Sequence, residues 1–298
     1  MAGGLKAPAA GTTGPQHASG ASPDAAPEAT GGTQSIERAV ALLMLVGRAG
    51  AEGARLADLV ASSGLSKPTV RRVLLALVRA GLVDQDEASR RYHVGPEAYV
   101  LGTLAAPRFG IHALALDGLS RIARQSGDCA FLSVPRGTFS VCLHREEGTW
   151  PIRTHVLQAG DRHPLGIGAG GLAILAALPE SEAARIVEAN AAALAGYPGY
   201  SPDLLRRAMG DTRARGYALN PGLYVAGSWG IGVPVIGPDG RPLAALSLAA
   251  IESRLGAERQ KELVPLLQRE AAALEAALGG SERGPPQRPA RSMARPAP

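Results

Sequence analysis

The pattern of apolar and polar positions separates the 298-residue chain into an aperiodic leader, a long periodic middle and an aperiodic tail. Residues 1–33 are mainly Ala, Gly, Pro, Thr and Ser, and residues 280–298 combine Pro with four arginines. Segments of this composition bury too little apolar surface to offset the entropy lost on ordering. We therefore expect a disordered leader and a disordered basic tail, the tail being either solvated or in weak contact with DNA phosphates.

The first periodic region predicts helices near 35–48 and 56–62, followed by a basic helix over 66–81 that Ser66 can cap. In the basic helix, one apolar stripe falls at i, i+3, i+4 and i+7 and must be buried: Val70, Val73, Leu74 and Leu77. Arg72 and Arg79 point away from this stripe, and no acidic residue occurs in the segment. A helix of this kind suits a negatively charged partner, above all duplex DNA.

Strand-like runs at 82–84 and 91–94 flank a polar turn and predict a hairpin. Two helices, a short turn containing Gly, a basic second helix and this hairpin form a winged helix-turn-helix over 34–95. A linker helix is expected at 96–108, before a second domain at 109–279.

The second domain is predicted to be α+β, with one antiparallel sheet and helices on its face and ends. Helices are expected at 111–126, 168–178, 180–194, 202–215 and 257–278. Strands are expected at 129–134, 139–144, 152–157, 231–236 and 243–251.

Composition narrows the chemistry. The net charge of +5 is compatible with nucleic acid without requiring it. The two cysteines provide no disulfide framework, no apolar run approaches the length of a bilayer span, and no signal-peptide pattern occurs, so a cytoplasmic protein without membrane contact is expected. Cys129, Cys142, His144 and His163 match no zinc spacing, so no metal is predicted. No catalytic nucleophile can be identified from spacing.

The glycine-rich segment 166–171 fits the dinucleotide pattern G-x-G-x-x-G. That motif requires a buried strand directly before it, and the polar residues 161–164 do not predict one; Glu188 has nearly the expected acidic spacing but lies in a predicted helix. The favoured interpretation is a loop whose backbone N–H groups face a small anionic ligand at the start of a helix, without a cofactor. A nucleotide-cofactor enzyme is the alternative.

Several motifs in a fixed order resemble the IclR family of transcriptional regulators over about residues 34–279. The first domain carries SIERA (35–39), GLSKPTVRRVL (64–74), GLV (81–83) and RYHVG (91–95). The second carries GDRHPL (160–165), GYAL (216–219), VPV (233–235) and ALS (245–247). The resemblance implies a dimer or a dimer of dimers with a GAF-like effector domain, operator DNA as partner, and RNA polymerase as a further candidate partner.

On this basis the basic helix is the DNA-reading element. Arg72 or Arg71 can reach guanine O6 and N7 in the major groove. Residues at the helix start are expected on phosphates: Ser66, Lys67 and Thr69. Arg38 is a weaker phosphate candidate. Arg90 and Arg91 are candidates for the adjacent minor groove, with simple solubility as the alternative.

The effector contacts that the resemblance implies fall in four places: Gly168, Ala169 and Gly170; Asn220; Gly230; and Ser247 with Ala249. Related regulators place an acid at 220, a cysteine at 230 and a second serine at 249, so this chain departs at three positions. Trp229 and Leu165 are expected as walls. The loss of polar groups and bulk predicts a larger, less polar pocket for a carboxylate-bearing effector bigger than a two- or three-carbon keto acid.

The sequence therefore predicts a ligand-responsive, sequence-specific DNA-binding regulator rather than an enzyme. Repression and activation are both open, as are the effector and the operator. A nucleic-acid packaging protein without sequence preference is a third hypothesis.

Overall fold

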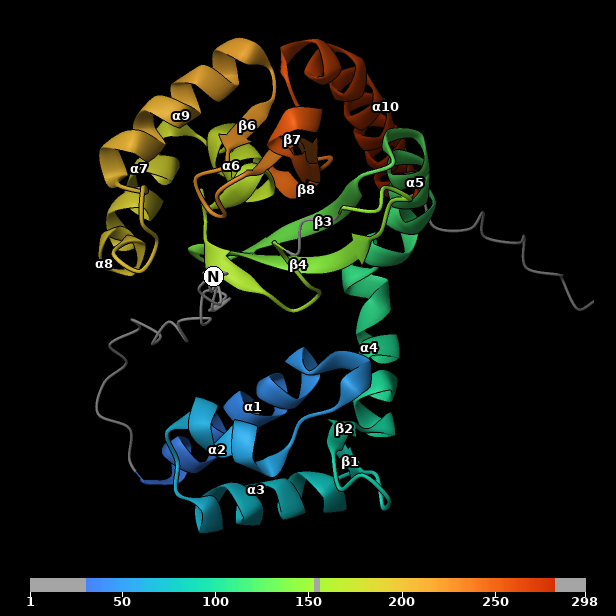
Figure 1. Ribbon diagram of the computed structural model, residues 1–298, viewed down its shortest axis with the longest axis vertical. Coiled ribbons are helices and arrows are strands. Elements are labelled where there is room, and N and C mark those ends of the chain that lie inside the picture. Colours follow the sequence, from blue (N-terminus) through green and yellow to red (C-terminus); the bar gives the residue numbers. More distant parts are fainter. Residues whose placement is uncertain (1–30, 153–155, 282–298) are drawn as a thin grey trace, which may run out of the picture.

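The computed structural model describes residues 31–152 and 156–281. The leader and the basic tail, which are expected to be disordered, lie almost wholly outside these residues. Two domains are joined by one helix (Figure 1).

The first domain is a winged helix-turn-helix. It contains α1 (Gly31–Arg48), the short η1 (Gly50–Glu52), α2 (Leu56–Ser63), α3 (Lys67–Arg79), β1 (Val83–Gln85) and β2 (Tyr92–Val94). The α3 stripe packs as predicted, because Val70, Leu74 and Leu77 are buried and Val73 is half-buried in one core with α1 and α2. The wing is tied to this core by a β-bridge between Ala54 and Tyr92.

The first helix differs from its predicted orientation. The spacing of apolar residues predicts one stripe on this helix, made of Ile36, Val40, Leu43 and Met44. In the structure Ile36, Val40 and Met44 are exposed, at 66%, 54% and 48%, and Leu43 is half-buried. The buried residues are Leu42 and Val46 instead. Two apolar faces therefore occur on α1, and within residues 31–152 and 156–281 only one of them is covered.

The linker helix α4 (Pro96–Phe109) leaves the wing and meets α5 (Ile111–Ser126) at Gly110. Its exposed side chains are largely apolar: Tyr99, Val100, Leu101 and Leu104. In the described residues no single helix is long and apolar enough to cross a bilayer, and the bent pair formed by α4 and α5 passes that test by length and composition only.

The second domain is built on a six-stranded antiparallel sheet in the order β5-β4-β3-β8-β7-β6. The strands are β3 (Cys129–Arg136), β4 (Phe139–Glu146), β5 (Arg162–Pro164), β6 (Ala218–Pro221), β7 (Ser228–Ile236) and β8 (Pro242–Ile251). Helices α5 and α10 (Ala257–Ser281) cover one face, and α6 (Gly168–Ala177) covers the other. Outside α6 lie α7 (Glu180–Ala189), α8 (Ala191–Leu194) and α9 (Pro202–Arg215).

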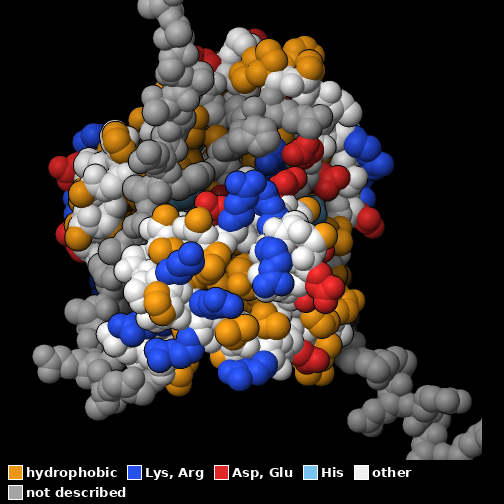
Figure 2. Space-filling model, turned by 60° about the horizontal axis from the view of Figure 1, so that its bottom comes forward, with side chains coloured by type: hydrophobic (Ala, Val, Ile, Leu, Met, Phe, Trp, Pro, Cys, Tyr) orange, Lys and Arg blue, Asp and Glu red, His pale blue; other side chains and the backbone are white. Residues whose placement is uncertain are grey.

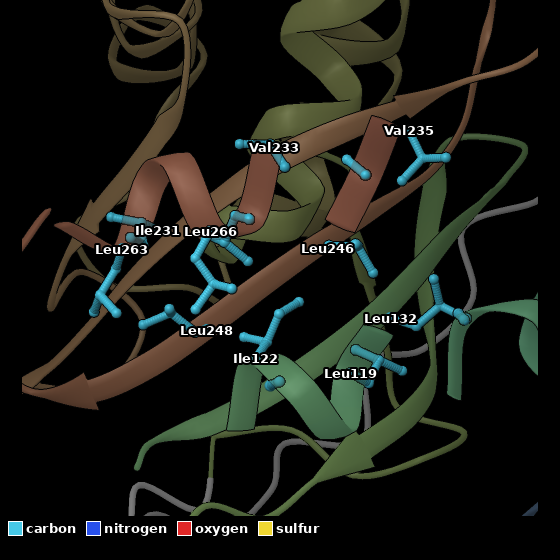
Figure 3. Close-up of a cluster of buried hydrophobic side chains, with 14 of the residues drawn as sticks. Leu119, Ile122, Leu132, Ile231, Val233, Val235, Leu246, Leu248, Leu263 and Leu266 are labelled. Atoms are coloured by element: carbon cyan, nitrogen blue, oxygen red, sulfur yellow. The ribbon is translucent and has the colours of Figure 1, made fainter. Parts of the chain in front are cut away.

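The main core lies between the sheet and the pair α5 and α10 (Figure 3). Leu119 and Ile122 of α5 meet Leu132, Leu246 and Leu248 of the strands, and all are at most 1% exposed. Burying each such side chain stabilises the fold by about 1.5–3 kcal/mol. The α+β prediction is confirmed, and this core holds rigid the strands whose other face carries the site described below.

The predicted domain differs from the structure in several details. Residues 153–155 of the strand expected at 152–157 lie outside the described part of the chain, and the described residues 152, 156 and 157 are not in a strand. The edge position beside β4 is taken by β5. The sequence pattern does not predict strand β6, because this strand is short and ends in Pro221. The helix expected at 180–194 breaks at Asn190, whose buried amide donates to the Thr138 carbonyl at 2.7 Å.

Candidate DNA-binding helix and effector pocket

Helix α3 presents a cationic face to solvent. Lys67, Arg71, Arg72 and Arg79 are exposed, and none forms an ion pair with any residue in 31–152 or 156–281. Figure 2 shows Lys and Arg side chains gathered on the face turned toward the viewer, which carries the winged domain. Leu75, half-exposed at 51%, lies one turn from both Arg72 and Arg79 and adds an apolar contact to that face.

The start of α3 differs from the predicted cap. Ser66 occupies the N-cap position with an extended backbone, but its hydroxyl accepts no backbone N–H. It is paired instead with the Thr69 hydroxyl at 2.9 Å. The first N–H groups of the helix therefore lack a side-chain acceptor from this residue.

The two wing arginines have different surroundings. Arg90 is exposed and has φ 58, in a turn held by hydrogen bonds from Ser89 to Asp86. These bonds also lower the pKa of Asp86. Arg91 is half-buried, and its Nη1 donates to the carbonyls of Glu52 and Gly53 at 3.0 and 2.9 Å. Arg91 thus braces the wing against the loop after α1, whereas Arg90 projects from the wing. Arg38 lies half-buried on α1.

A pocket lies between the start of α6 and the sheet face that α6 covers, with about 570 Å³ of space not filled by atoms, its open mouth included. Eight of the predicted effector residues line it: Gly168, Ala169, Gly170, Asn220, Trp229, Gly230, Ser247 and Ala249. Leu165 is wrong as a wall. It follows the edge strand β5 and is fully buried in the separate cluster between α6 and α9.

The pocket also contains residues that the sequence did not indicate. They come from β3, from β4, from the segment between β4 and β5, from β5 and from the loop between β6 and β7, and they include Phe131, Ser133, Ser140, Cys142, Val156, Leu157, Asp161, His163 and Tyr224. Phe131 and Cys142 form an apolar cluster with Val156 and Leu157. Their alternation on β3 and β4 was visible in the sequence, but which face of the sheet receives α6 was not.

Helix α6 and the sheet approach each other so closely that two of the contact positions, Gly170 and Gly232, have little room for a Cβ. A Cβ on Gly170 would lie 3.1 Å from the Ser247 hydroxyl and 3.2 Å from that of Ser133. A Cβ on Gly232 would lie 2.8 Å from the Ala169 carbonyl oxygen, so α6 can sit directly on β7 only without side chains there. Ile167 precedes α6 and offers no side-chain cap. The Gly168 N–H donates to the Tyr200 hydroxyl, and the following residues of the first turn, Ala169, Gly170 and Gly171, line the pocket without a side-chain cap on their N–H groups.

The polar groups of the pocket are mostly neutral. Among its residues in the described part of the chain there is no Lys or Arg, and the one carboxylate, Asp161, accepts the Gln158 N–H at 2.7 Å. Burial raises the pKa of the Cys142 thiol to about 12. Burial likewise raises the pKa of Tyr224, with a further contribution from Asp161. These groups stay protonated at neutral pH.

One wall is organised by hydrogen bonds around Asn220. The Tyr200 hydroxyl accepts the Gly168 N–H at 3.2 Å and donates to Asn220 Oδ1 at 3.4 Å. The same Oδ1 accepts the Leu223 N–H at 3.1 Å. Burial raises the pKa of Tyr200 to about 12, so its hydroxyl remains a donor.

The arrangement does not fit a dinucleotide. The segment 166–171 follows an edge strand of three residues in an antiparallel sheet, not a buried parallel strand. The glycines serve the close contact between α6 and the sheet. The loop therefore frames a small-molecule pocket and provides no support for a nucleotide-cofactor enzyme.

A winged helix with an unpaired cationic face, joined by one helix to an α+β domain with an internal pocket, defines a two-domain DNA-binding regulator. Sequence comparison specifies the class further. Residues 35–87 match the IclR helix-turn-helix domain, and residues 104–276 match the bacterial transcriptional regulator IclR C-terminal domain. The chain belongs to the IclR family of transcriptional regulators, so the predicted family is confirmed.

Named relatives agree. The chain is 32% identical over 234 residues to the glycerol operon regulatory protein of Streptomyces coelicolor, covering 78% of this chain and 90% of that one. It is 29% identical over 252 residues to the HTH-type transcriptional regulator XynR of Escherichia coli, covering 83% and 97%. An IclR transcriptional regulator from Alicyclobacillus acidocaldarius superposes with a TM-score of 0.67 at 26% identity, covering 82% and 98%. These relatives are named as regulators and not as enzymes.

Proposed function

We propose that this regulator binds operator DNA as a dimer or tetramer, with its affinity set by a small carboxylate-bearing metabolite. The observation that carries the DNA-binding part is the exposed, unpaired cationic face of α3. Arg72 is the outward long donor for guanine O6 and N7, with Arg71 on its flank. Lys67, Ser66 and Thr69, at the start of the helix, are assigned to phosphates.

The wing and the first helix supply further contacts. Arg90 projects from the wing and is assigned to the minor groove, where narrow A·T tracts concentrate negative potential. Arg91 keeps the wing in place through the Glu52 and Gly53 carbonyls and can reach DNA only with its remaining donors. Arg38 is a secondary phosphate candidate.

Dimerisation is supported by the uncovered apolar stripes. Val40 and Met44 on α1 and Leu101 and Leu104 on α4 are between 48% and 73% exposed. Burial of such side chains against a second copy would remove them from water and present two α3 helices to half-sites roughly 34 Å apart or a multiple of that. Leu104→Glu is expected to shift sedimentation toward the monomer; unchanged sedimentation at equal concentration would place the interface elsewhere.

The effector assignment rests on the pocket at α6. The first-turn N–H groups and the Ser133 and Ser247 hydroxyls suit a carboxylate, while Phe131, Val156 and Leu157 suit an apolar body. Glycine at 230 and alanine at 249 leave room, which favours an effector larger than a two- or three-carbon keto acid and compatible with an aromatic ring. Such an effector regulates only if it binds the domain arrangements with unequal affinity.

Gel retardation on the intergenic DNA upstream of the gene, with competitor at fixed salt, tests the DNA-binding part. Arg72→Ala is expected to cost about 1–3 kcal/mol at one base pair and to relax specificity there. Lys67→Ala should weaken all sequences alike and reduce the slope of log affinity against log salt by about 1. Arg124→Ala, an exposed arginine of α5, is the matched control. Equal losses across sequences for both α3 variants would refute the division between base reader and phosphate contact.

A further inference from the structure

The amide of Asn220 has a single orientation that its hydrogen bonds determine. Asn220 lies on β6, at the wall of the pocket, and is 9% exposed. A backbone N–H can only donate, so the atom that lies 3.1 Å from the Leu223 nitrogen must be the amide oxygen and not the nitrogen. A flipped amide would set two donors against each other.

The contact with the Tyr200 hydroxyl agrees with this direction. This hydroxyl accepts the Gly168 N–H at 3.2 Å, and the hydroxyl proton is then available for Asn220 Oδ1 at 3.4 Å. The donors Gly168 N–H, Tyr200 O–H and Leu223 N–H thus converge, directly or in relay, on one amide oxygen. Both contacts of this oxygen come from residues that do not themselves line the pocket, Tyr200 and Leu223.

The consequence concerns the opposite end of the amide. Asn220 lines the pocket, and its Nδ2 has no hydrogen-bond partner among residues 31–152 and 156–281. Other polar groups beside it can also donate: the first-turn N–H groups of α6 after Gly168, and the Ser133 and Ser247 hydroxyls near Gly170. This end of the pocket therefore offers several neutral donors, and the described residues that line the pocket include no Lys or Arg.

We propose that Asn220 forms a donor subsite that selects an acceptor-only group, a carboxylate or carbonyl oxygen, and that Tyr200 is the positioning residue that fixes this polarity. An acidic side chain held by the same two donors would instead present an acceptor and select a hydroxyl or amine. The inference rests on the proposed effector-binding function and specifies the group that the effector places against β6.

Benzoate and benzyl alcohol are matched probes, because they share a ring and differ in the polarity of one group. In calorimetric titration of the full chain, the wild-type protein is expected to bind benzoate at least about tenfold more tightly than benzyl alcohol. Asn220→Asp should weaken benzoate at least about tenfold through like-charge repulsion and leave benzyl alcohol bound as tightly or more tightly. The variant should fold, because Tyr200 and Leu223 donate equally well to a carboxylate.

Tyr200→Phe tests the positioning role. Loss of one hydrogen bond should reduce the preference for benzoate over benzyl alcohol by about three- to tenfold. Tyr197→Phe is the matched control: its hydroxyl lies 3.0 Å from His163 Nδ1 and does not contact Asn220, so the preference should stay within about twofold.

Three results would overturn the proposal: a wild-type protein that binds both probes equally or neither, an unchanged preference in Asn220→Asp, or equal effects of the two tyrosine variants. Gel retardation by the unliganded proteins reports separately on DNA binding. Normal retardation with a failed ligand test rejects only the donor subsite, whereas lost retardation in the wild-type protein rejects the proposed function.

Discussion

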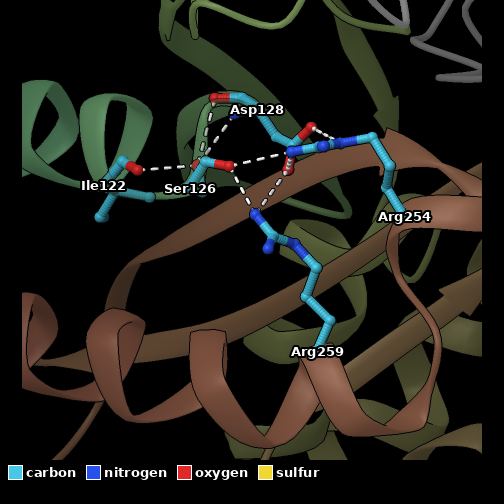
Figure 4. Close-up of polar contacts among 5 residues, drawn as sticks. All are labelled: Ile122, Ser126, Asp128, Arg254 and Arg259. Carbon is cyan, nitrogen blue, oxygen red and sulfur yellow. Dashed lines mark hydrogen bonds and ion pairs between the residues drawn. The ribbon is translucent and has the colours of Figure 1, made fainter.

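Asp128 is the centre of a buried ionic cluster in the effector domain (Figure 4). Its carboxylate, 3% exposed, accepts Arg254 Nε and Nη2 at 3.0 and 3.1 Å, and Arg259 Nη2 lies 3.7 Å away. Both guanidinium groups also donate to the Ser126 carbonyl, at 3.1 and 2.6 Å. Arg254 in turn lies 3.7 Å from the centre of the Trp150 ring. The cluster joins the end of α5, the start of β3 and the segment after β8.

Asp128→Ala would leave two guanidinium groups without their carboxylate. Removing one partner of a buried ion pair typically costs about 3–5 kcal/mol. Arg254 and Arg259 have side chains 17% and 33% exposed and keep the Ser126 carbonyl, so water can partly replace the lost partner. We therefore expect a loss near the lower limit, about 3 kcal/mol. For a domain of this size that corresponds to a fall in Tm of roughly 6–12 °C.

Urea denaturation followed by far-ultraviolet circular dichroism measures the loss. Asp128→Asn keeps an acceptor without the charge and should cost less, about 1–2 kcal/mol. Glu182→Ala is the exposed control: its carboxylate binds Arg241 at 2.8 Å with side chains 27% and 50% exposed, and its loss should stay within about 1 kcal/mol. If Asp128→Ala costs no more than Glu182→Ala, the reasoning from burial fails.

Three further predictions concern the core and the pocket. Leu74→Ala in α3, at a fully buried position, should lower the free energy of unfolding of the winged domain by about 2–5 kcal/mol. Leu75→Ala, at a half-exposed position of the same helix, should lower it by less than about 1 kcal/mol. Equal urea midpoints for the two variants would contradict the assigned faces of the helix. Burial raises the pKa of the Cys142 thiol from 9.0 to about 12, so between these pH values the folded state keeps a proton that the unfolded state loses. The contribution of this thiol to the free energy of unfolding is therefore complete below pH 9 and is lost as the pH rises toward 12. Urea midpoints between pH 8 and 11 should therefore fall less steeply in Cys142→Ala than in the wild type, and parallel curves would refute this. Gly170→Ala, whose Cβ would lie 3.1 Å from the Ser247 hydroxyl, should weaken benzoate at least about tenfold in calorimetry while leaving operator retardation unchanged.

The local sequence pattern was sufficient to predict the buried and exposed faces of α3, because an apolar stripe at helical spacing determines which residues face outward. Val70, Leu74 and Leu77 are buried as that rule requires, and Arg72 is exposed. The same rule failed on α1. There both Leu42 and the stripe through Val40 are apolar, and spacing alone does not say which of two apolar faces this chain covers.

Predicting the residues of the pocket required the resemblance to the family as well as the local sequence pattern. Eight of the nine proposed effector residues line it, and Leu165 does not, because its neighbours across α6 and α9 are distant in sequence. The lining residues Phe131 and Cys142 were read only as strand residues. Their role depends on which sheet face α6 covers, and that is decided by strand order and by the glycines that admit close contact.

The sequence by itself determined the helix periods, the basic composition of α3, the hairpin of the wing and the family, since these depend on residues within one or two turns or on motif order. Tertiary structure alone decided that Arg91 binds the Glu52 and Gly53 carbonyls, that Leu165 is core, and that Asn220 offers its nitrogen to the pocket. The physical reason is that a hydrogen bond or a packed surface depends on both partners. The two partners of Asn220 come from the loop before α9 (Tyr200) and the turn after β6 (Leu223), and Tyr200 is held in turn by the Gly168 N–H at the start of α6, so only folding brings these groups together.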